Sequence, residues 1–200
     1  MCLASGRGVE PGSRGLTLGD GYEKLNRRSA KVKKKVVLLT LLAMLVGRTA
    51  WAEVTVLFSP KDKIKENILT ELESLTSTLD LAIHEISSSD MAQALSKAKG
   101  RGVNVRIITD SKQAKMKSSR ITYLINKGIT VKVIKGKEQG GMNHRFAILD
   151  GRKVMTGSFD WSETSEKWNY ENLLIASGHD VVASYQREFE RLWREKRVIE

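Results

Sequence analysis

The chain has 200 residues, of which 40% are hydrophobic and 28% charged. This composition is typical of a globular protein, and the length suffices for one domain with a buried core. The single cysteine, Cys2, excludes a fold held together by disulfides. The net charge of +11 is concentrated in residues 1–52, which contain ten Lys and Arg against three Asp and Glu, whereas residues 53–200 contain 24 against 20. The overall charge is therefore weak evidence for nucleic-acid binding.

The first thirty residues are rich in Gly and Arg and show no apolar periodicity. We expect residues 1–30 to be a disordered extension, or to precede the true start of translation near Lys31.

Residues 31–52 have a basic start, an apolar run over 36–46 and small residues on both sides of Trp51. This is the pattern of a secretory signal peptide cleaved after Ala52. Because the apolar run is shorter than the roughly 20 residues that span a bilayer, we expect no stable transmembrane span. The protein is then exported, either periplasmic or secreted, although Arg48 near the cleavage site leaves an uncleaved membrane anchor as an alternative.

The remaining residues alternate between strand patterns and helix patterns. Strands are predicted at 53–59, 79–86, 103–110, 129–134, 144–150, 153–158 and 171–177. Helices are predicted between Pro60 and Leu75, at 89–99, at 121–126, from Ser162 and at 180–196, and the segment 111–119 is predicted to be a polar loop.

This order of elements predicts an α/β layered fold in which helices flank a mixed central β-sheet. The nearly continuous apolar strand 103–110 is typical of a buried parallel strand. The Asp150-Gly151 pair between two strand patterns predicts an antiparallel hairpin.

Positive charge gathers between Ser111 and Leu149, where nine Lys and Arg face one acidic residue, Glu138. The run is either a surface for a polyanion or a solvated face.

The stretch Gly140–Trp161, "GGMNHRFAILDGRKVMTGSFDW", has the composition of a phosphate-handling site. Strand alternation puts Asn143 and Arg145 on one face of the sheet and His144 on the other. A glycine at 157 lets the backbone approach an anion, and the Ser158 hydroxyl can donate to it. A phosphodiester needs such donors, a nucleophile in line, and carboxylates that orient the nucleophile.

Several segments together resemble the phospholipase D superfamily, specifically its small single-motif branch of secreted endonucleases and related phosphodiesterases. They are "FSP", "ALSKAKGRGVNVRIITD", "YLINKGITVKVI", "HRFAILDGRKVMTGSFDW" and "NYENLLI", in family order. The resemblance implies a phospholipase D-like domain over 53–200 and hydrolysis of phosphodiesters without metal or cofactor. In addition, no His or Cys cluster has the spacing of metal ligands.

The family motif is HxKxxxxD followed by GSxN, and this chain departs from it at three polar positions. Counting back from Asp150, the His position is Asn143 and the Lys position is Arg145, while Asp160 replaces the usual Asn. In the family the His is the nucleophile, and the Lys and Asn bind phosphate. Arg145 can still bind phosphate, together with Ser158. Asn143 cannot form a phosphoenzyme, and Asp160 would repel a phosphate unless it is protonated or paired, for example with Arg145.

Three further residues complete the candidate site. His144 is an alternative nucleophile if a bulge or register slip brings it into line; otherwise it is a supporting or core histidine. The resemblance gives Asp150 the role of orienting the nucleophile and matches Glu171 to the family's supporting acid. We expect His84 to be structural and His179 to be a surface or capping residue, with Trp161 and Trp168 packed around the site.

Two functions follow from these residues. One is a phosphodiesterase of the phospholipase D or endonuclease type, and it requires a homodimer because family catalysis uses two motifs and this chain has one. The other is a catalytically inactive protein of the same fold that binds nucleic acid or anionic lipid. In both cases the basic run favours nucleic acid over phospholipid.

Overall fold

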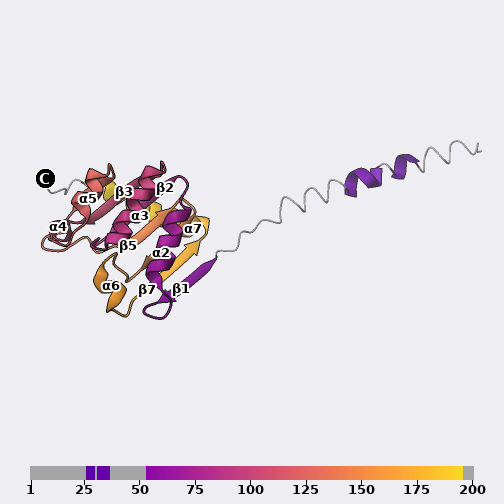
Figure 1. Ribbon diagram of the computed structural model, residues 1–200. Helices are drawn as coiled ribbons and strands as arrows, with labels where there is room; N and C mark the ends of the chain where they lie inside the picture. The colour runs from indigo at the N-terminus through magenta and orange to yellow at the C-terminus, as the bar shows by residue number, and fades with distance from the viewer. Residues whose placement is uncertain (1–25, 30, 37–52, 196–200) are drawn as a thin grey trace, which may run out of the picture. The chain divides into compact units, whose positions relative to one another are not determined.

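The computed structural model describes residues 26–29, 31–36 and 53–195 (Figure 1). The chain divides into two units, Met1–Ala50 and Trp51–Glu200. In the first unit, residues 26–29 and 31–36 are helical and exposed. The predictions for residues 1–25, 30 and 37–52, which include most of the expected signal peptide, concern residues outside the described ranges.

Within residues 53–195 the second unit forms a seven-stranded sheet of order β1-β7-β6-β5-β2-β3-β4. The strands are β1 (Val54–Phe58), β2 (Thr78–Ile83), β3 (Asn104–Asp110), β4 (Thr130–Ile134), β5 (Arg145–Leu149), β6 (Lys153–Gly157) and β7 (Asn172–Ser177). Strand β3 pairs in parallel with both β2 and β4, while β5 and β6 form the predicted antiparallel hairpin. The predicted mixed sheet is therefore confirmed.

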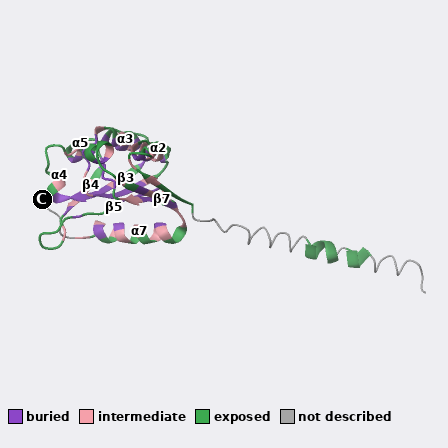
Figure 2. Ribbon diagram, turned by 90° about the horizontal axis from the view of Figure 1, so that it is seen from below, coloured by how far each residue is buried: buried purple, intermediate pink, exposed green. Residues whose placement is uncertain are grey.

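Helices cover both faces of this sheet. They are α2 (Ile64–Ser74), α3 (Ser89–Gly100), α4 (Ser111–Ala114), α5 (Ile121–Asn126), α6 (Glu163–Lys167) and α7 (His179–Trp193). Figure 2 shows α2, α3 and α5 over one face and α7 under the other. The layered fold with flanking helices is confirmed.

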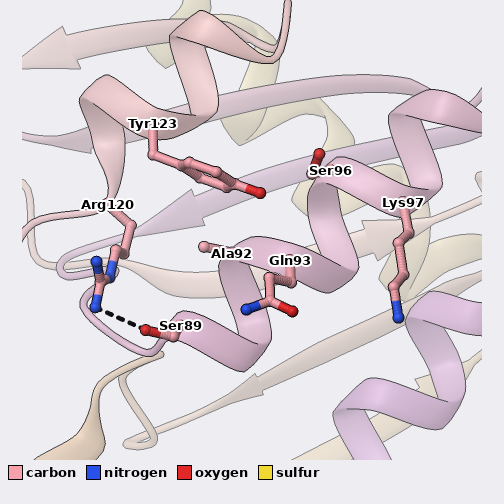
Figure 3. A pocket seen from close by; sticks show the side chains of 7 residues that line it. All are labelled: Ser89, Ala92, Gln93, Ser96, Lys97, Arg120 and Tyr123. Carbon is pink, nitrogen blue, oxygen red and sulfur yellow. Dashed lines mark hydrogen bonds between the residues drawn. The ribbon is translucent and has the colours of Figure 1, made fainter.

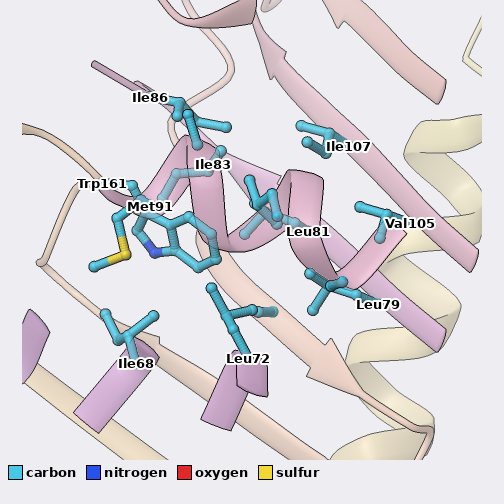
Figure 4. Packing of buried hydrophobic residues seen from close by; sticks show 14 of the residues in the cluster. Ile68, Leu72, Leu79, Leu81, Ile83, Ile86, Met91, Val105, Ile107 and Trp161 are labelled. Atoms are coloured by element: carbon cyan, nitrogen blue, oxygen red, sulfur yellow. The ribbon is translucent and has the colours of Figure 1, made fainter. Parts of the chain in front are cut away.

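Each face has its own apolar core. On the side of α2, α3 and α5, Trp161 packs among Ile68, Leu72 and Met91, and is only 3% exposed (Figure 4). On the other side, Phe189 of α7 packs with strand residues that include Phe146. Successive residues of β5 point into different cores, as strand alternation requires.

Salt bridges tie α7 to the sheet. Arg106 of β3 binds Asp80 of β2 through two hydrogen bonds of 2.7 Å, and it binds Glu190 of α7 at 2.6 Å. Its guanidinium also lies 4.9 Å from the ring centre of Phe189. Because this arginine joins three elements at once, it holds α7 in a defined position on the sheet.

Predictions about element boundaries were wrong at several places. Helix α7 ends at Trp193, whereas the predicted helix continued to residue 196. Strand β2 ends at Ile83 rather than Ile86, and Ile86 instead forms an isolated bridge with Trp161. Residues 111–114, predicted to be loop, form α4, because the Asp110 carboxylate accepts hydrogen bonds from the backbone of Lys112 and Gln113. Such a cap stabilises a helix start that has no apolar periodicity to reveal it.

Candidate functional site

Arg145, the first residue of β5, stands at the centre of a polar cluster. Its Nη2 donates to Asp160 Oδ2 at 2.7 Å, and its Nη1 donates to Asn143 Oδ1 at 2.9 Å. The side chains of Arg145 and Asp160 are 22% and 12% exposed. The three altered motif positions therefore meet, and the pairing of Asp160 with Arg145 is found.

The carboxyl of Asp160 sits in an environment that disfavours its charge. Burial raises its pKa above the ordinary value, although the hydrogen bond and charge of Arg145 oppose this shift. Its Oδ1 accepts a 3.3 Å hydrogen bond from the backbone of Glu85. Among the described residues, Arg145 Nε is buried and has no hydrogen-bond partner. Arg145 and Asp160 thus bind each other, but their burial costs free energy. Both groups lose hydration, and one donor of Arg145 stays unpaired.

Ser158 and Glu171 form a second polar cluster. Ser158 lies two residues before Asp160 in the sequence, and Glu171 directly precedes β7. The Ser158 hydroxyl donates to Glu171 Oε2 and accepts from the backbone and side chain of Asn172 at 3.0 and 3.2 Å. A hydroxyl has one proton and two lone pairs, so all its hydrogen-bonding capacity is in use. A phosphate can bind Ser158 only by replacing one of these partners.

Gly157 is required by the packing of the sheet. A Cβ at this position would lie 2.2 Å from the carbonyl oxygen of Asn172, a distance no side chain tolerates. The close approach aligns the end of β6 with the start of β7 and places Ser158 beside Glu171.

His144 lies on the face of the sheet opposite to Arg145, as alternation predicted. Its ring packs edge-on against Phe146 at 5.5 Å, and its Nε2 is 3.3 Å from Glu188 of α7. The side chain is 46% exposed. The structure therefore does not bring His144 into the cluster of Arg145.

The expected role of Asp150 is not supported by its position. At the far end of β5, roughly 17 Å from Arg145 for five residues of strand, its carboxylate accepts hydrogen bonds from Thr76, Ser77 and Thr78 at 2.8–3.0 Å. Asp150 thus holds the start of β2 and cannot orient a group at Asn143.

The structure places the two other histidines and the two tryptophans of the sequence analysis as follows. His84 Nδ1 is 3.1 Å from the carbonyl oxygen of Met142, and the charge of His84 is among the causes that act to lower the pKa of Asp160, so this histidine lies close to the cluster of Arg145. His179 is exposed beside Asp180 at the start of α7. Trp161 is buried in the core, but Trp168 is 79% exposed, so its predicted packing around the site was wrong.

Asp110 is a positioning residue that the sequence analysis missed. Its Oδ2 accepts from the backbone of Met142 at 2.9 Å, and a Cβ at Gly141 would lie 2.9 Å from that same oxygen. Asp110 therefore fixes the segment directly before Asn143. Two features of the sequence could have indicated this role. Asp110 is a carboxylate at the end of an apolar strand, and the glycines at 140 and 141 directly precede the motif.

A groove of about 310 Å³ between α3 and α5 contains none of the predicted site residues (Figure 3). There Arg120 points toward Ser89 and donates to its hydroxyl at 2.7 Å. This arginine joins the start of α5 to the start of α3.

Among the described residues, no group of three or more His, Cys, Asp or Glu side chains could hold a metal ion. Within the same ranges, no helix is long and apolar enough to cross a membrane.

The guanidinium of Arg145, the Ser158 hydroxyl and the carboxylates of Asp160 and Glu171 lie near the ends of the neighbouring strands β5, β6 and β7 of the mixed sheet. A family model described as "Cardiolipin synthase, PLD-like domain" matches residues 68–193. The chain belongs to this family, which lies within the phospholipase D superfamily.

Mitochondrial cardiolipin hydrolases are similar to this chain in sequence. The protein of Chlamydomonas reinhardtii is 37% identical over 125 residues, covering 62% of this chain and 55% of its own length. That of Xenopus laevis is 37% identical over 134 residues, covering 67% and 63%. The human protein is 34% identical over 128 residues, covering 64% and 50%. The chain thus spans between half and two thirds of the length of these relatives.

Two solved structures share the fold. NucT from Helicobacter pylori has a TM-score of 0.68 at 23% identity and covers 74% of this chain and 98% of its own. Nuc from Salmonella typhimurium, a phospholipase D family member, has a TM-score of 0.68 at 24% identity and covers 74% and 99%.

The predicted localisation was wrong. We expected an exported protein, periplasmic or secreted, but the names of the similar curated proteins place them in mitochondria. The basic and apolar pattern of residues 31–52 misled the prediction, because basic N-terminal segments also occur in organelle-targeting sequences.

Proposed function

We propose that this protein recognises phosphodiesters at Arg145 and that the site as it stands binds them without hydrolysis. The observation that carries the proposal is Asn143 at the position of the family's nucleophilic His, with its carboxamide oxygen bonded to Arg145. A carboxamide has no free lone pair on nitrogen with which to attack phosphorus, so this position cannot form a covalent phosphoenzyme.

Arg145 supports binding because a guanidinium can donate two parallel hydrogen bonds to a phosphate. In the free protein, Asp160 holds the same donor at 2.7 Å. A phosphate would therefore displace the Asp160 carboxylate, and the raised pKa of Asp160 favours its release as a neutral acid. Binding should then tighten as the pH falls.

Hydrolysis is the second candidate, because the similar curated proteins are named hydrolases. In that case His144 would have to reach the site through a local change in β5, without metal or cofactor. The nine cations between Ser111 and Leu149 favour nucleic acid over phospholipid as the phosphodiester in either case.

Assembly and location complete the proposal. With one motif per chain, a homodimer would bring two sites together across a two-fold axis, and the molar mass in light scattering tests this.

Ten Lys and Arg against three acids in residues 1–52, together with the relatives' names, support delivery to mitochondria. A fusion of residues 1–52 to a fluorescent protein tests the location.

Restoring the family motif tests the chemistry. We would assay the full chain and the triple variant Asn143→His, Arg145→Lys, Asp160→Asn on single-stranded DNA, cardiolipin vesicles and bis-p-nitrophenyl phosphate in EDTA. A matched variant with Asn143→Gln in place of Asn143→His is the control.

We expect no turnover by the unsubstituted chain and by the control, and measurable turnover by the triple variant. Turnover by the unsubstituted chain that disappears in His144→Ala would overturn binding without hydrolysis and establish the second candidate.

A further inference from the structure

His84 is held next to the residues of the candidate site. It directly follows β2, whose last residue, Ile83, pairs with Arg145 across the sheet. The carbonyl of His84 accepts a 3.2 Å hydrogen bond from the Thr109 hydroxyl, and its Nδ1 lies 3.1 Å from the carbonyl oxygen of Met142. These contacts fix both the backbone and the ring of His84 between β3 and the segment that leads into β5.

The ring of His84 offers one nitrogen to a ligand. Because the carbonyl oxygen of Met142 can only accept, Nδ1 is the nitrogen that donates to it and carries the proton of the neutral ring. In the described ranges, Arg145 Nε is the one buried side-chain nitrogen or oxygen without a hydrogen-bond partner, and no partner of His84 Nε2 lies within those ranges either. The half-buried ring of His84 therefore leaves Nε2 open to solvent.

The Asp160 carboxylate lies where donors of two segments converge. Its Oδ2 accepts from Arg145 at 2.7 Å, and its Oδ1 accepts at 3.3 Å from the backbone N–H of Glu85, the residue after His84. The charge of His84 also acts on this carboxyl, since it is among the causes that oppose the effect of burial on the pKa of Asp160. A phosphate that replaces Asp160 at Arg145 would therefore meet the backbone N–H of Glu85 and the ring of His84.

The other charged groups around His84 are already committed. Asp110 follows Thr109 in β3, and its two oxygens accept three backbone hydrogen bonds. Arg145 is the first donor to the phosphate, and Asp160 is the group that the phosphate displaces. An imidazole ordinarily changes its charge near pH 6.5, so the ring of His84 is suited to make this site respond to pH near neutrality.

We infer that His84 is the pH-dependent donor of the phosphodiester site, which joins Arg145 in binding the phosphate as an imidazolium and does not bind it as a neutral ring. This inference rests on the proposed phosphodiester recognition and adds a specificity-determining residue to it. A phosphate oxygen only accepts hydrogen bonds. The Nε2 lone pair of the neutral ring therefore repels it, whereas the Nε2–H of the imidazolium forms a charge-assisted hydrogen bond.

Calorimetric titration of the full chain with bis-p-nitrophenyl phosphate tests this inference, because this phosphodiester keeps one negative charge between pH 5.5 and pH 8. Asp160→Asn is the reference, since it removes the carboxyl whose own protonation would also tighten binding in acid. We expect the reference to bind roughly tenfold more tightly at pH 5.5 than at pH 8, the effect of one hydrogen bond to a charged group.

Two double variants show whether His84 causes this pH dependence. With His84→Gln added to Asp160→Asn, binding should change less than about twofold over the same range. With His179→Gln added instead, at the exposed start of α7, the tenfold change should remain.

An NMR titration of the histidine ring protons in the unsubstituted chain supplies a second measurement. Because a ligand that prefers the protonated ring must favour its protonation, bis-p-nitrophenyl phosphate should move the titration midpoint of His84 to higher pH and leave that of His179 in place.

A tenfold pH dependence that persists without His84, or binding by Asp160→Asn that does not change with pH, would overturn the inference and leave recognition at Arg145 standing. An unmoved titration of His84 in the presence of the ligand would do the same. If neither the unsubstituted chain nor Asp160→Asn bound the phosphodiester at any pH, the proposed function itself would fail.

Discussion

The two ends of strand β5 hold their charged side chains in opposite ways. At the end of the strand, the Asp150 carboxylate accepts five hydrogen bonds from residues 76–78, and these lower its pKa although burial opposes the shift. At the start of the strand, burial raises the pKa of Asp160 despite its pairing with Arg145, and Arg145 Nε is left without a partner among the described residues.

The difference separates a carboxylate whose charge the fold stabilises from one whose charge the fold disfavours. Backbone N–H groups aimed at Asp150 replace the hydration it loses, so its charge stabilises the fold. Asp160 keeps a charge that the fold does not fully compensate, a common property of ligand sites. The stability that Asp150 contributes and the stability that Asp160 contributes should therefore depend on pH with opposite sign.

Arg145→Met should have the largest effect on stability. It leaves the buried Asp160 carboxylate unpaired, and we expect a loss of about 3 kcal/mol in the free energy of unfolding near neutral pH. The loss should shrink in acid, where Asp160 is protonated. Urea denaturation measures both, and adding Asp160→Asn should recover most of the loss. An equally unstable double variant would contradict this account.

Asp150→Asn should follow, with a loss of about 2 kcal/mol. The amide nitrogen of the new Asn is a donor, and it would face backbone N–H and hydroxyl donors of residues 76–78 that now bind a carboxylate oxygen. Because the folded-state pKa is lowered, the stability that Asp150 contributes is present above its unfolded pKa, about 3.9, and is lost as the pH falls below it. Urea denaturation at several pH values should therefore show the difference between the two proteins shrinking in acid. Asp180→Asn, at an exposed position on α7, is the control and should show no change.

Asp160→Asn should change stability by less than about 1 kcal/mol at neutral pH, because an amide oxygen can still accept from Arg145. The pH dependence has the opposite sign. A raised folded-state pKa contributes stability below the unfolded value, and this is lost as the pH rises through the folded-state value. The native chain should therefore lose stability relative to the variant as the pH increases from 4. Parallel curves for the two proteins would refute the raised pKa.

His144→Ala should have the smallest effect, about 0.5 kcal/mol or less, because its contact with Glu188 is half exposed. If its thermal unfolding showed a much larger loss, His144 would belong to the structural core of β5.

Much of the fold could be predicted because its signals are local. Alternation located the strands, the Asp150-Gly151 turn gave the hairpin, and the apolar run 103–110 gave the parallel centre. Helix α4 was missed, since a capping contact from Asp110 marks its start and no apolar periodicity reveals it. The early end of β2 was missed because His84 to Ile86 continue the same residue pattern as the strand.

In the candidate site, too, the features that depend on local sequence patterns could be predicted and those that depend on distant contacts could not. Spacing along one strand predicted that Asn143 and Arg145 share a face and that His144 does not, and both are confirmed. The partners of Asp150 lie more than 70 positions away along the chain, a contact that no local pattern shows. The role of Asp110 likewise depends on a hydrogen bond that its carboxylate accepts from the backbone of Met142, 32 positions away along the chain.

Gly157 has a consequence for the way such chains change over generations. Any side chain there would collide with the Asn172 carbonyl, so selection for a foldable sheet alone suffices to keep this glycine. A protein of this fold without catalytic activity would still need glycine at position 157, because a substitution there would prevent correct folding. The geometry of the sheet alone therefore accounts for Gly157, so this glycine by itself is no evidence of catalysis, whereas Asn143 and Asp160 are positions at which the chain departs from the family motif.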